Sequence, residues 1–275
     1  MADVGVRSFC KKLYWWLRGE RYLQRRVAQL ERLLTEHPNF AATTALENLF
    51  PSPAVSVIMP TWNRAFVIGA AIRSIQAQTF SDWELIVVDD GSTDSTETVL
   101  TSFAADPRIR YIKKPHAGQC AARNLGQREA RGSLIAYLDS DNLWYPGFLA
   151  AAVPVFASRK DVDLVYGAKV LDSAPRIQFE PFDHARLIEE CYISTSMMIH
   201  RRELIDRFGG FDEQLSSLED WDLVLRYTAH APPYPLPVLA VRYRVMDDNR
   251  VTVTRPVGSD AEKIRRKWSP SAKGN

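Results

Sequence analysis

Short runs of aliphatic and β-branched residues alternate with helix-length segments between residues 55 and 138, and this alternation constrains the fold more than any other feature. Four runs are typical of buried strands, at residues 55–59, 84–88, 109–112 and 134–138. The segments between them that favour helices are residues 66–77, 94–105 and 118–131. Strands separated by helices of this length form βαβ units, so we expect an α/β fold with a mostly parallel central sheet flanked by helices.

The composition is that of an ordinary globular chain. Its 275 residues are 46% hydrophobic and 25% charged, enough for a sizeable core without disulfide or zinc support. The cysteines Cys10, Cys120 and Cys191 are too few and too widely spaced for a disulfide framework, which favours a reducing compartment. The longest apolar stretches, such as residues 148–157, fall short of the roughly 20 residues that span a bilayer, and we see no secretory signal. We therefore expect a cytoplasmic protein.

The net charge of +2 hides an acidic body between two basic ends. Residues 1–36 carry eight basic and four acidic residues, and residues 255–275 carry six and two, so the middle of the chain is acidic. We divide the chain into a basic amphipathic helical extension (1–37), a proline-containing linker (38–53), a central domain (54–250) and a basic C-terminal tail (251–275). The central domain divides further into residues 54–145 and 146–250.

The N-terminal extension has the pattern of one amphipathic helix over residues 6–36. Apolar residues recur at three- and four-residue spacing, and tryptophans lie near its start. Such a helix packs on the body or pairs with a copy of itself, or it lies on an anionic membrane surface, here the inner face of the membrane. Nothing else in the chain supports nucleic-acid binding, so we expect no nucleic-acid partner.

Polar, turn-rich segments follow three of the predicted strands, at residues 60–64, 89–94 and 139–142. Ligands of open α/β sheets bind at the carboxyl ends of the strands, so these segments predict one shared crevice. Helix capping explains Gly91 to Asp94, but it leaves Asp89 and Asp90 unexplained. An acidic residue in that place accepts hydrogen bonds from a base or a ribose.

Asp139 and Asp141 form an Asp-x-Asp pair directly after the fourth strand. Side chains two residues apart in extended chain point the same way, so both carboxylates face one cation. Hard oxygen ligands suit Mn²⁺ or Mg²⁺, which proteins hold with one or two carboxylates plus substrate phosphates. The alternative is a solvated acidic turn, and the position after a buried strand favours the metal.

Four linked motifs resemble family 2 glycosyltransferases of GT-A fold over residues 54–245. They are Val-Ser-Val-Ile-Met-Pro-Thr-Trp-Asn-Arg at 55–64, the segment 78–94 ending Asp-Asp-Gly-Ser-Thr-Asp, Ala-Ala-Arg-Asn at 121–124, and Asp-Ser-Asp at 139–141. The resemblance implies an inverting, metal-dependent transfer of a sugar from a nucleotide-diphosphate donor, a UDP-sugar in most relatives. The acceptor would be a hydroxyl of a saccharide or a lipid-linked saccharide in polysaccharide or glycoconjugate biosynthesis.

The resemblance also implies roles for single residues. Asp90 would meet the base with Asp89 beside it, Arg123 would lie near the nucleotide and diphosphate, and Asp139 would lie nearer the ribose. Asp141 would be the direct metal ligand, with Asp139 as the second. The full set expected at the nucleotide sugar is Pro60, Thr61, Asn63, Arg64, Asp89, Asp90, Arg123, Asp139 and Ser140.

An acidic pair at the start of a predicted helix, residues 218–230, is the candidate catalytic base. Inverting transfer needs a carboxylate to take the proton of the acceptor hydroxyl. In the family such a pair follows a Gly-Gly-Phe-Asp segment, as Glu219 and Asp220 follow residues 209–212 here, and Asp220 is the first choice with Glu219 second. The competing interpretation is a capping box between Ser217 and Asp220. Three residues are expected on the donor-sugar and acceptor side: Gly210, Phe211 and Trp221.

Two departures from the family pattern bear on the mechanism. Many relatives carry a histidine near the final strand, where this chain has Met246, a poor ligand for a hard cation, with Arg244 or Arg250 as electrostatic substitutes. The Gln-x-x-Arg-Trp motif of processive synthases is absent, which favours one sugar per encounter. The alternative function is a non-catalytic nucleotide-sugar-binding or scaffold protein of the same fold. A nucleotidyltransferase is disfavoured because residues 60–64 contain no glycine.

Overall fold

The computed structural model describes residues 52–172, 176–244 and 257–268. The amphipathic helix expected over residues 6–36, nearly all of the linker, Met246 and Arg250 lie outside the described residues. No helix in the described ranges has the length and apolar character needed to cross a bilayer.

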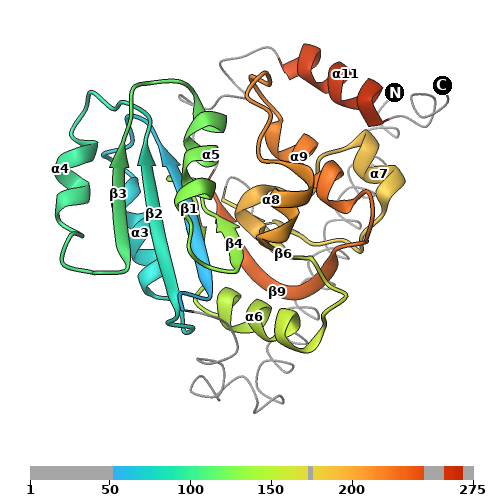
Figure 1. The fold of residues 1–275 in the computed structure, drawn as a ribbon, viewed down its shortest axis with the longest axis horizontal. Coiled ribbons are helices and arrows are strands. Elements are labelled where there is room, and N and C mark those ends of the chain that lie inside the picture. Colours follow the sequence, from blue (N-terminus) through green and yellow to red (C-terminus); the bar gives the residue numbers. More distant parts are fainter. Residues whose placement is uncertain (1–51, 173–175, 245–256, 269–275) are drawn as a thin grey trace, which may run out of the picture. The chain divides into compact units, whose positions relative to one another are not determined.

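The first half of the chain forms a parallel sheet from alternating strands and helices (Figure 1). The order along the chain is β1 (Val55–Thr61), α3 (Ile68–Gln76), β2 (Trp83–Asp89), α4 (Thr96–Thr101), β3 (Ile109–Lys113), α5 (Gln119–Glu129) and β4 (Leu134–Tyr137). In space the strands run β3-β2-β1-β4, all parallel. Right-handed crossovers therefore place α3 and α4 on one face and α5 on the other, where it packs on β1 and β2.

The strands β1 and β2 are buried along their whole length, which explains their continuous apolar pattern. Gly126 of α5 lets that helix approach the sheet closely, because a Cβ there would meet the Ile58 side chain at 2.5 Å. The predicted α/β architecture with a mostly parallel first half is confirmed.

The second half extends the same sheet with antiparallel and parallel pairs. Its strands are β5 (Leu143–Trp144), β6 (Leu164–Leu171), β7 (Arg176–Gln178), β8 (Met198–Arg201) and β9 (Tyr234–Tyr243). Strand β8 runs antiparallel to β4 and β6, and β6 pairs in parallel with β9. The described residues thus form one nine-stranded sheet in the order β3-β2-β1-β4-β8-β6-β9-β5, with β7 added to β6.

Helices of the second half pack around this part of the sheet. They are α6 (Phe148–Ser158), α7 (His184–Glu189), the 3₁₀ turn η2 (Thr195–Met197), α8 (Glu203–Phe208), α9 (Glu219–Thr228) and α11 (Val257–Trp268). Helix α9 packs against α7 and α8, and α11 packs against α7 and α9. The sequence interpretation of residues 251–275 as a basic tail therefore differs from the structure over α11, whose Ile264 is buried in the body.

Candidate functional site

The carboxyl ends of β1 and β2 meet side by side, as their parallel register requires. Thr61 pairs with Asp89, and the amide of Asp90 donates to the carbonyl of Thr61 at 2.8 Å. The side chain of Asn63 links the loops beyond, because its Oδ1 accepts from the amides of Thr93 at 2.8 Å and Asp94 at 3.3 Å. Asn63 holds a positive φ of 52°, a conformation that asparagine tolerates better than most residues.

The two carboxylates at the end of β2, Asp89 and Asp90, are both buried, and they bind different partners. Asp89 accepts from the amide of Ser92 and from the hydroxyl of Tyr111, so it braces its own turn. Asp90 accepts from Lys114 Nζ at 2.5 Å and from the amides of Ala117 and Gly118. Asp90 therefore organises the loop that joins β3 to α5.

The remaining residues expected along the nucleoside surround the end of β1. The hydroxyl of Thr61 is buried and has no hydrogen-bond partner within the described residues. The amide of Arg64 donates to the Thr96 hydroxyl at 2.9 Å, which holds the loop against the start of α4. Pro60 lies within β1, opposite Val88 of β2. These residues converge on the end of the sheet that the sequence pattern indicated.

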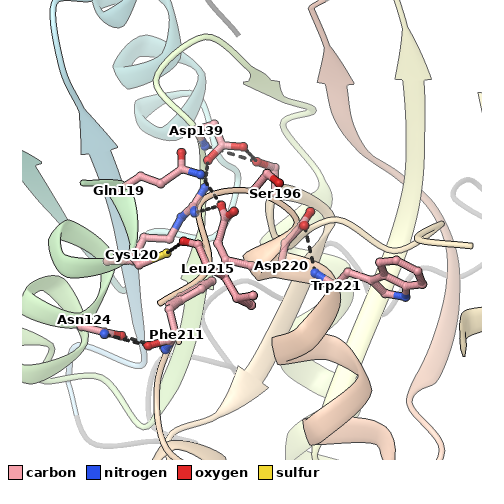
Figure 2. Close-up of polar contacts among 12 residues, drawn as sticks. Gln119, Cys120, Asn124, Asp139, Ser196, Phe211, Leu215, Asp220 and Trp221 are labelled. Carbon is pink, nitrogen blue, oxygen red and sulfur yellow. Dashed lines mark hydrogen bonds and ion pairs between the residues drawn. The ribbon is translucent and has the colours of Figure 1, made fainter. Parts of the chain in front are cut away.

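Arg123 joins two acidic motifs that lie far apart in the sequence (Figure 2 shows the surrounding side chains). Only 3% of this residue is exposed. Its Nη2 lies 2.6 Å from Asp139 Oδ1, and its Nη1 lies 2.6 Å from Glu219 Oε1. Burial opposes the charged form, but the charges of Asp139 and Glu219 outweigh it and raise the pKa of Arg123. The fork of one guanidinium thus connects the Asp-x-Asp turn to the start of α9.

The Asp-x-Asp turn is held from the opposite side by η2. The hydroxyl of Ser196 donates to Asp139 Oδ2 at 3.0 Å, while the amide of Asp139 donates back to Ser196 Oγ at 3.2 Å (Figure 2). The backbone amide of Asn142 donates a hydrogen bond to the carbonyl of Asp139 at 3.0 Å and closes the same turn. Ser140 between the two acids is buried.

The donor set at this turn suits a hard divalent cation. Asp139 already binds Arg123 through Oδ1 and Ser196 through Oδ2. No cluster of three or more His, Cys, Asp or Glu side chains suited to a metal occurs in the described parts of the chain. The two carboxylates of the Asp-x-Asp turn fit Mg²⁺ or Mn²⁺ with the remaining ligands from substrate phosphates and water, the usual protein environment of Mg²⁺.

Asp220 stands apart electrostatically from the other acids of the site. Burial, and next the charge of neighbouring Glu219, raise the pKa of Asp220 from 3.8 to about 7, while Arg123 acts in the opposite direction. One oxygen accepts from the amide of Trp221 at 2.9 Å, which fixes the carboxylate over the first turn of α9 (Figure 2). A carboxylate whose pKa is close to neutrality has the proton affinity that a general base requires.

The Gly-Gly-Phe-Asp segment is fastened to α5 by a reciprocal pair of hydrogen bonds. Asn124 Nδ2 donates to the carbonyl of Phe211 at 3.0 Å, and the amide of Phe211 donates to Asn124 Oδ1 at 2.8 Å. A Cβ on Gly210 would lie 2.5 Å from Asn124 Oδ1 and 2.4 Å from Gln127 Oε1. Glycine is required here because the segment must approach α5 this closely.

Two residues expected on the substrate side lie in the core instead. Phe211 packs edge-on against Tyr137 with ring centroids 5.3 Å apart and lies beneath the guanidinium of Arg123. Trp221 is also buried, and its Nε1 donates to the carbonyl of Leu187 in α7 at 2.5 Å. Both aromatic rings therefore support the acidic residues from behind rather than forming an open surface.

A small cavity of about 160 Å³ lies between β6, β7 and the segment that follows α7. Aromatic rings and polar side chains both line it, including Tyr166, Lys169, Glu190, Cys191 and Tyr192. The pKa of the Cys191 thiol is raised first by burial and then by the charge of Asp220. The cavity also reaches Met197, the residue after Ser196.

The end of β9 returns to the Asp-x-Asp turn. The backbone amide of Arg244 donates to Asn142 Oδ1 at 3.1 Å, so the backbone of Arg244 lies beside the residue that follows the Asp-x-Asp pair. Arg244 is thus one of the two arginines named as electrostatic substitutes for the family histidine, and it lies beside the turn.

Sequence reasoning missed several side chains that hold the site together. Gln119 donates to Glu219 at 2.5 Å, Ser196 holds Asp139, and Lys114 neutralises Asp90. Gln119 and Glu219 are 100 residues apart, so no local pattern connects them. Lys114 lies just after the third predicted strand, and this position at a strand end was the only sequence pattern that pointed to a role for Lys114 near the acidic residues.

Comparison with known proteins supports the same interpretation. The family model described as glycosyl transferase family 2 matches residues 56–208. A PGL/p-HBAD biosynthesis glycosyltransferase of Mycobacterium bovis is 32% identical over 195 residues, covering 70% of this chain and 74% of the relative.

Two solved structures share the fold. Staphylococcus aureus TarS 1–349 in complex with UDP-GlcNAc has a TM-score of 0.67 at 21% identity and covers 76% of this chain. The chain spans 64% of that protein, less than two thirds. The mannosyltransferase PcManGT of Pyrobaculum calidifontis, in complex with GDP-Man and Mn²⁺, has a TM-score of 0.56 at 21% identity, covering 89% of this chain and 72% of its own. The GT-A-like fold is thereby confirmed. The family model matches more than half of the chain, and a relative is more than 30% identical over most of both sequences. The chain therefore belongs to glycosyl transferase family 2.

Proposed function

We propose that this glycosyltransferase moves a single sugar from a nucleotide-diphosphate donor to a hydroxyl of a saccharide or lipid-linked saccharide, with inversion at the anomeric carbon. The observation that carries the proposal is the pairing of Asp220, whose pKa is about 7, with the Arg123 bridge to Asp139. Arg123 binds Asp139 and also Glu219, the residue directly before Asp220, so the donor-side carboxylate is linked to the turn that carries the base. The solved relatives that bind UDP-GlcNAc and GDP-Man support a nucleotide-sugar donor.

Asp220 acts as the general base. As the acceptor oxygen forms its bond to the anomeric carbon, the hydroxyl proton passes to the Asp220 carboxylate. The bond between the anomeric carbon and the diphosphate oxygen breaks on the opposite side, and its electron pair leaves with the diphosphate. Glu219 keeps Asp220 basic through its negative charge, while its own oxygen is bound by Arg123 and Gln119.

The donor binds at the carboxyl ends of β1, β2 and β4. The nucleoside contacts residues at the first two strand ends, with Asp90 toward the base: Pro60, Thr61, Asn63, Arg64, Asp89 and Asp90. Asp139 and Asp141 would hold Mn²⁺ or Mg²⁺, which when bound neutralises charge on the departing diphosphate. Arg123 fixes the orientation of Asp139, and Arg244 adds positive charge beside the same turn.

The acceptor saccharide binds in the cavity whose wall includes Cys191, a residue whose thiol is reached by the charge of Asp220. The ring of Tyr192 offers a surface to the apolar face of a sugar ring, and Lys169 and Glu190 offer hydrogen-bond partners to hydroxyls. Phe211, Gly210 and Trp221 act on this side through packing, since both rings are buried.

The deciding experiment combines a donor panel with one substitution. UDP- and GDP-sugars are tested with Mn²⁺ for binding by calorimetry and for release of the nucleoside diphosphate, first with the wild-type protein and then with Asp220→Asn. We expect one donor class to bind both proteins with similar affinity, and turnover to fall by about 10³-fold or more in the variant.

Two outcomes would contradict the proposal. Unchanged turnover in Asp220→Asn would exclude Asp220 as the base. Binding of a nucleotide sugar without turnover of any acceptor or water by the wild-type protein would favour the alternative function, a nucleotide-sugar-binding scaffold.

A further inference from the structure

The C-terminal helix α11 contacts the catalytic region at the loop that leads into α9. Asp260 of α11 is 1% exposed, and its Oδ2 accepts four hydrogen bonds from two consecutive serines. The donors are the amide and hydroxyl of Ser216, at 3.0 and 2.7 Å, and the amide and hydroxyl of Ser217, at 3.0 and 3.1 Å. Lys263 Nζ binds the other oxygen at 3.0 Å. A carboxylate with this many donors fixes the backbone it binds.

The far end of α11 contacts α9 just after the candidate base. Lys267 Nζ lies 2.8 Å from Asp222 Oδ1, and Trp268 Nε1 donates to the same oxygen at 3.2 Å. Asp222 is buried and also pairs with Arg226 at 2.7 Å. Burial would raise the pKa of Asp222, but these donors, Lys267 first, lower it.

The middle of α11 reaches the residue directly beside Asp220. The guanidinium carbon of Arg265 lies 5.5 Å from the centroid of the Trp221 ring, and Arg265 Nη2 donates to the carbonyl of Glu189 at the end of α7. Trp221 is itself bonded to Leu187 of α7. Helix α11 thus contacts residues 216, 217, 221 and 222, on both sides of Asp220, together with the helix that precedes the acceptor cavity.

The backbone between these contacts needs outside support. Leu218, the N-cap residue of α9, has a φ of 56°, which is unfavourable for a non-glycine residue, and no side chain caps the helix. Ser217, which the sequence suggested as the cap, lies one residue before the N-cap position, and its hydroxyl donates to Asp260. The position of the first turn of α9, and with it Asp220, therefore depends on the anchorage that α11 provides.

We propose that α11 is a positioning element of the active site, in which Asp260 and Lys267 orient Asp220 by fixing the residues before and after it. The inference rests on the proposed function of Asp220 as the base. Asp260 touches no substrate and acts only through Ser216 and Ser217. Ordinary helix packing would lower stability when disturbed, whereas positioning predicts a specific loss of the proton-transfer step.

The test compares Asp260→Ala with Glu262→Gln in the full chain. Glu262 lies on the same helix but is largely exposed, with Arg266 at 3.9 Å. Steady-state release of the nucleoside diphosphate is measured with UDP-GlcNAc and GDP-mannose, whichever the wild-type protein turns over, with Mn²⁺. We expect kcat to fall about ten- to hundredfold in Asp260→Ala with donor KM within about twofold, and both to stay unchanged in Glu262→Gln.

A double variant separates positioning from general damage. In an Asp220→Asn background, Asp260→Ala should cause no further loss of kcat, because the group it orients is already gone. Amide hydrogen exchange should become faster at residues 216–222 in Asp260→Ala and stay unchanged in β1 and β2.

The outcomes distinguish the two proposals. Full kcat in Asp260→Ala, or an equal additional loss in the Asp220→Asn background, would overturn the positioning role. If the Asp220→Asn variant keeps the wild-type kcat, the proposed function itself is overturned.

Discussion

Arg123 Nη1 and Glu219 Oε1 lie 2.6 Å apart in a pair from which solvent is almost excluded. Because the other nitrogen of the same guanidinium binds Asp139, one positive charge balances acids from both halves of the domain. Asp220 has no comparable share of that charge, and its pKa is raised to about 7. Of the three neighbouring carboxylates, Asp139 and Glu219 are paired with Arg123. Asp220 is the one whose pKa is raised.

The first prediction concerns the pH dependence of turnover. Glu219→Gln removes the negative charge that, after burial, contributes most to the raised pKa of Asp220. The pKa of Asp220 should therefore fall, and the acid limb of the kcat–pH profile should move to lower pH. Profiles from pH 5 to 9 check this, and an acid limb that stays near pH 7 or moves upward would contradict it.

Removal of Arg123 should be costly for folding. Arg123→Met leaves Asp139 and Glu219 without their shared cation, and breaking a buried ion pair in this way costs about 3–5 kcal/mol. Arg123→Lys keeps the charge but cannot bridge both carboxylates with one planar fork, so its loss should be smaller. Urea unfolding of the two variants checks the order, and equal stability of Arg123→Met and wild type would refute it.

Asp220→Asn should stabilise the protein most at alkaline pH. The folded pKa of about 7 lies above the ordinary value of 3.8, so stability falls as the pH rises through the window between these values. Above pH 7 the folded protein holds an ionised carboxylate that the asparagine variant lacks. The gain in unfolding free energy should be larger at pH 8 than at pH 4.5, measured by urea titration, and a larger gain at pH 4.5 would contradict the assignment.

Gly210→Ala should loosen the Gly-Gly-Phe-Asp segment. The added Cβ would stand 2.4 Å from Gln127 Oε1 and 2.5 Å from Asn124 Oδ1, so either the segment or these two side chains must move, at a cost of about 1–3 kcal/mol. Gly147→Ala is the matched control, because no atom lies within 4 Å of its Cβ position. Thermal unfolding should show a lowered Tm for the first variant and little change for the second.

Asp141→Asn should weaken binding of the metal and donor together. The substitution removes one anionic ligand of a cation expected to share its coordination with the diphosphate. Calorimetric titration with nucleotide should show a large Mn²⁺-dependent affinity in the wild-type protein, abolished by EDTA and strongly reduced in the variant. A nucleotide affinity that is the same with and without Mn²⁺ would exclude this role.

The strand ends could be predicted from sequence because their signals are local. The apolar runs at β1 and β2 are continuous since both strands are buried on two faces, and polar residues begin where each strand leaves the core. Strand β9 and helix α6 were harder to predict: β9 mixes buried and exposed positions, and α6 is apolar nearly all round with Pro154 inside it.

The contacts that complete the site depend on distance in space. The capping box expected between Ser217 and Asp220 does not form, because Leu218 and not Ser217 is the N-cap residue of α9. The Ser217 hydroxyl donates to Asp260, 43 residues further on. A serine hydroxyl binds local or distant partners equally well, and only the packed fold decides between them. The same reason hides Ser196 and Gln119, whose acceptors lie 57 and 100 residues away.

Strands β4 and β8 pair antiparallel, and this junction separates the two halves of the sheet. On the proposed function, the residues expected at the nucleoside follow β1 and β2 on one side of this junction. The lining of the proposed acceptor cavity comes from the other side. The segment between β6 and β8 would then set the acceptor preference separately from the donor preference. A chimaera that replaces residues 176–192 should inherit a new acceptor preference while keeping its donor.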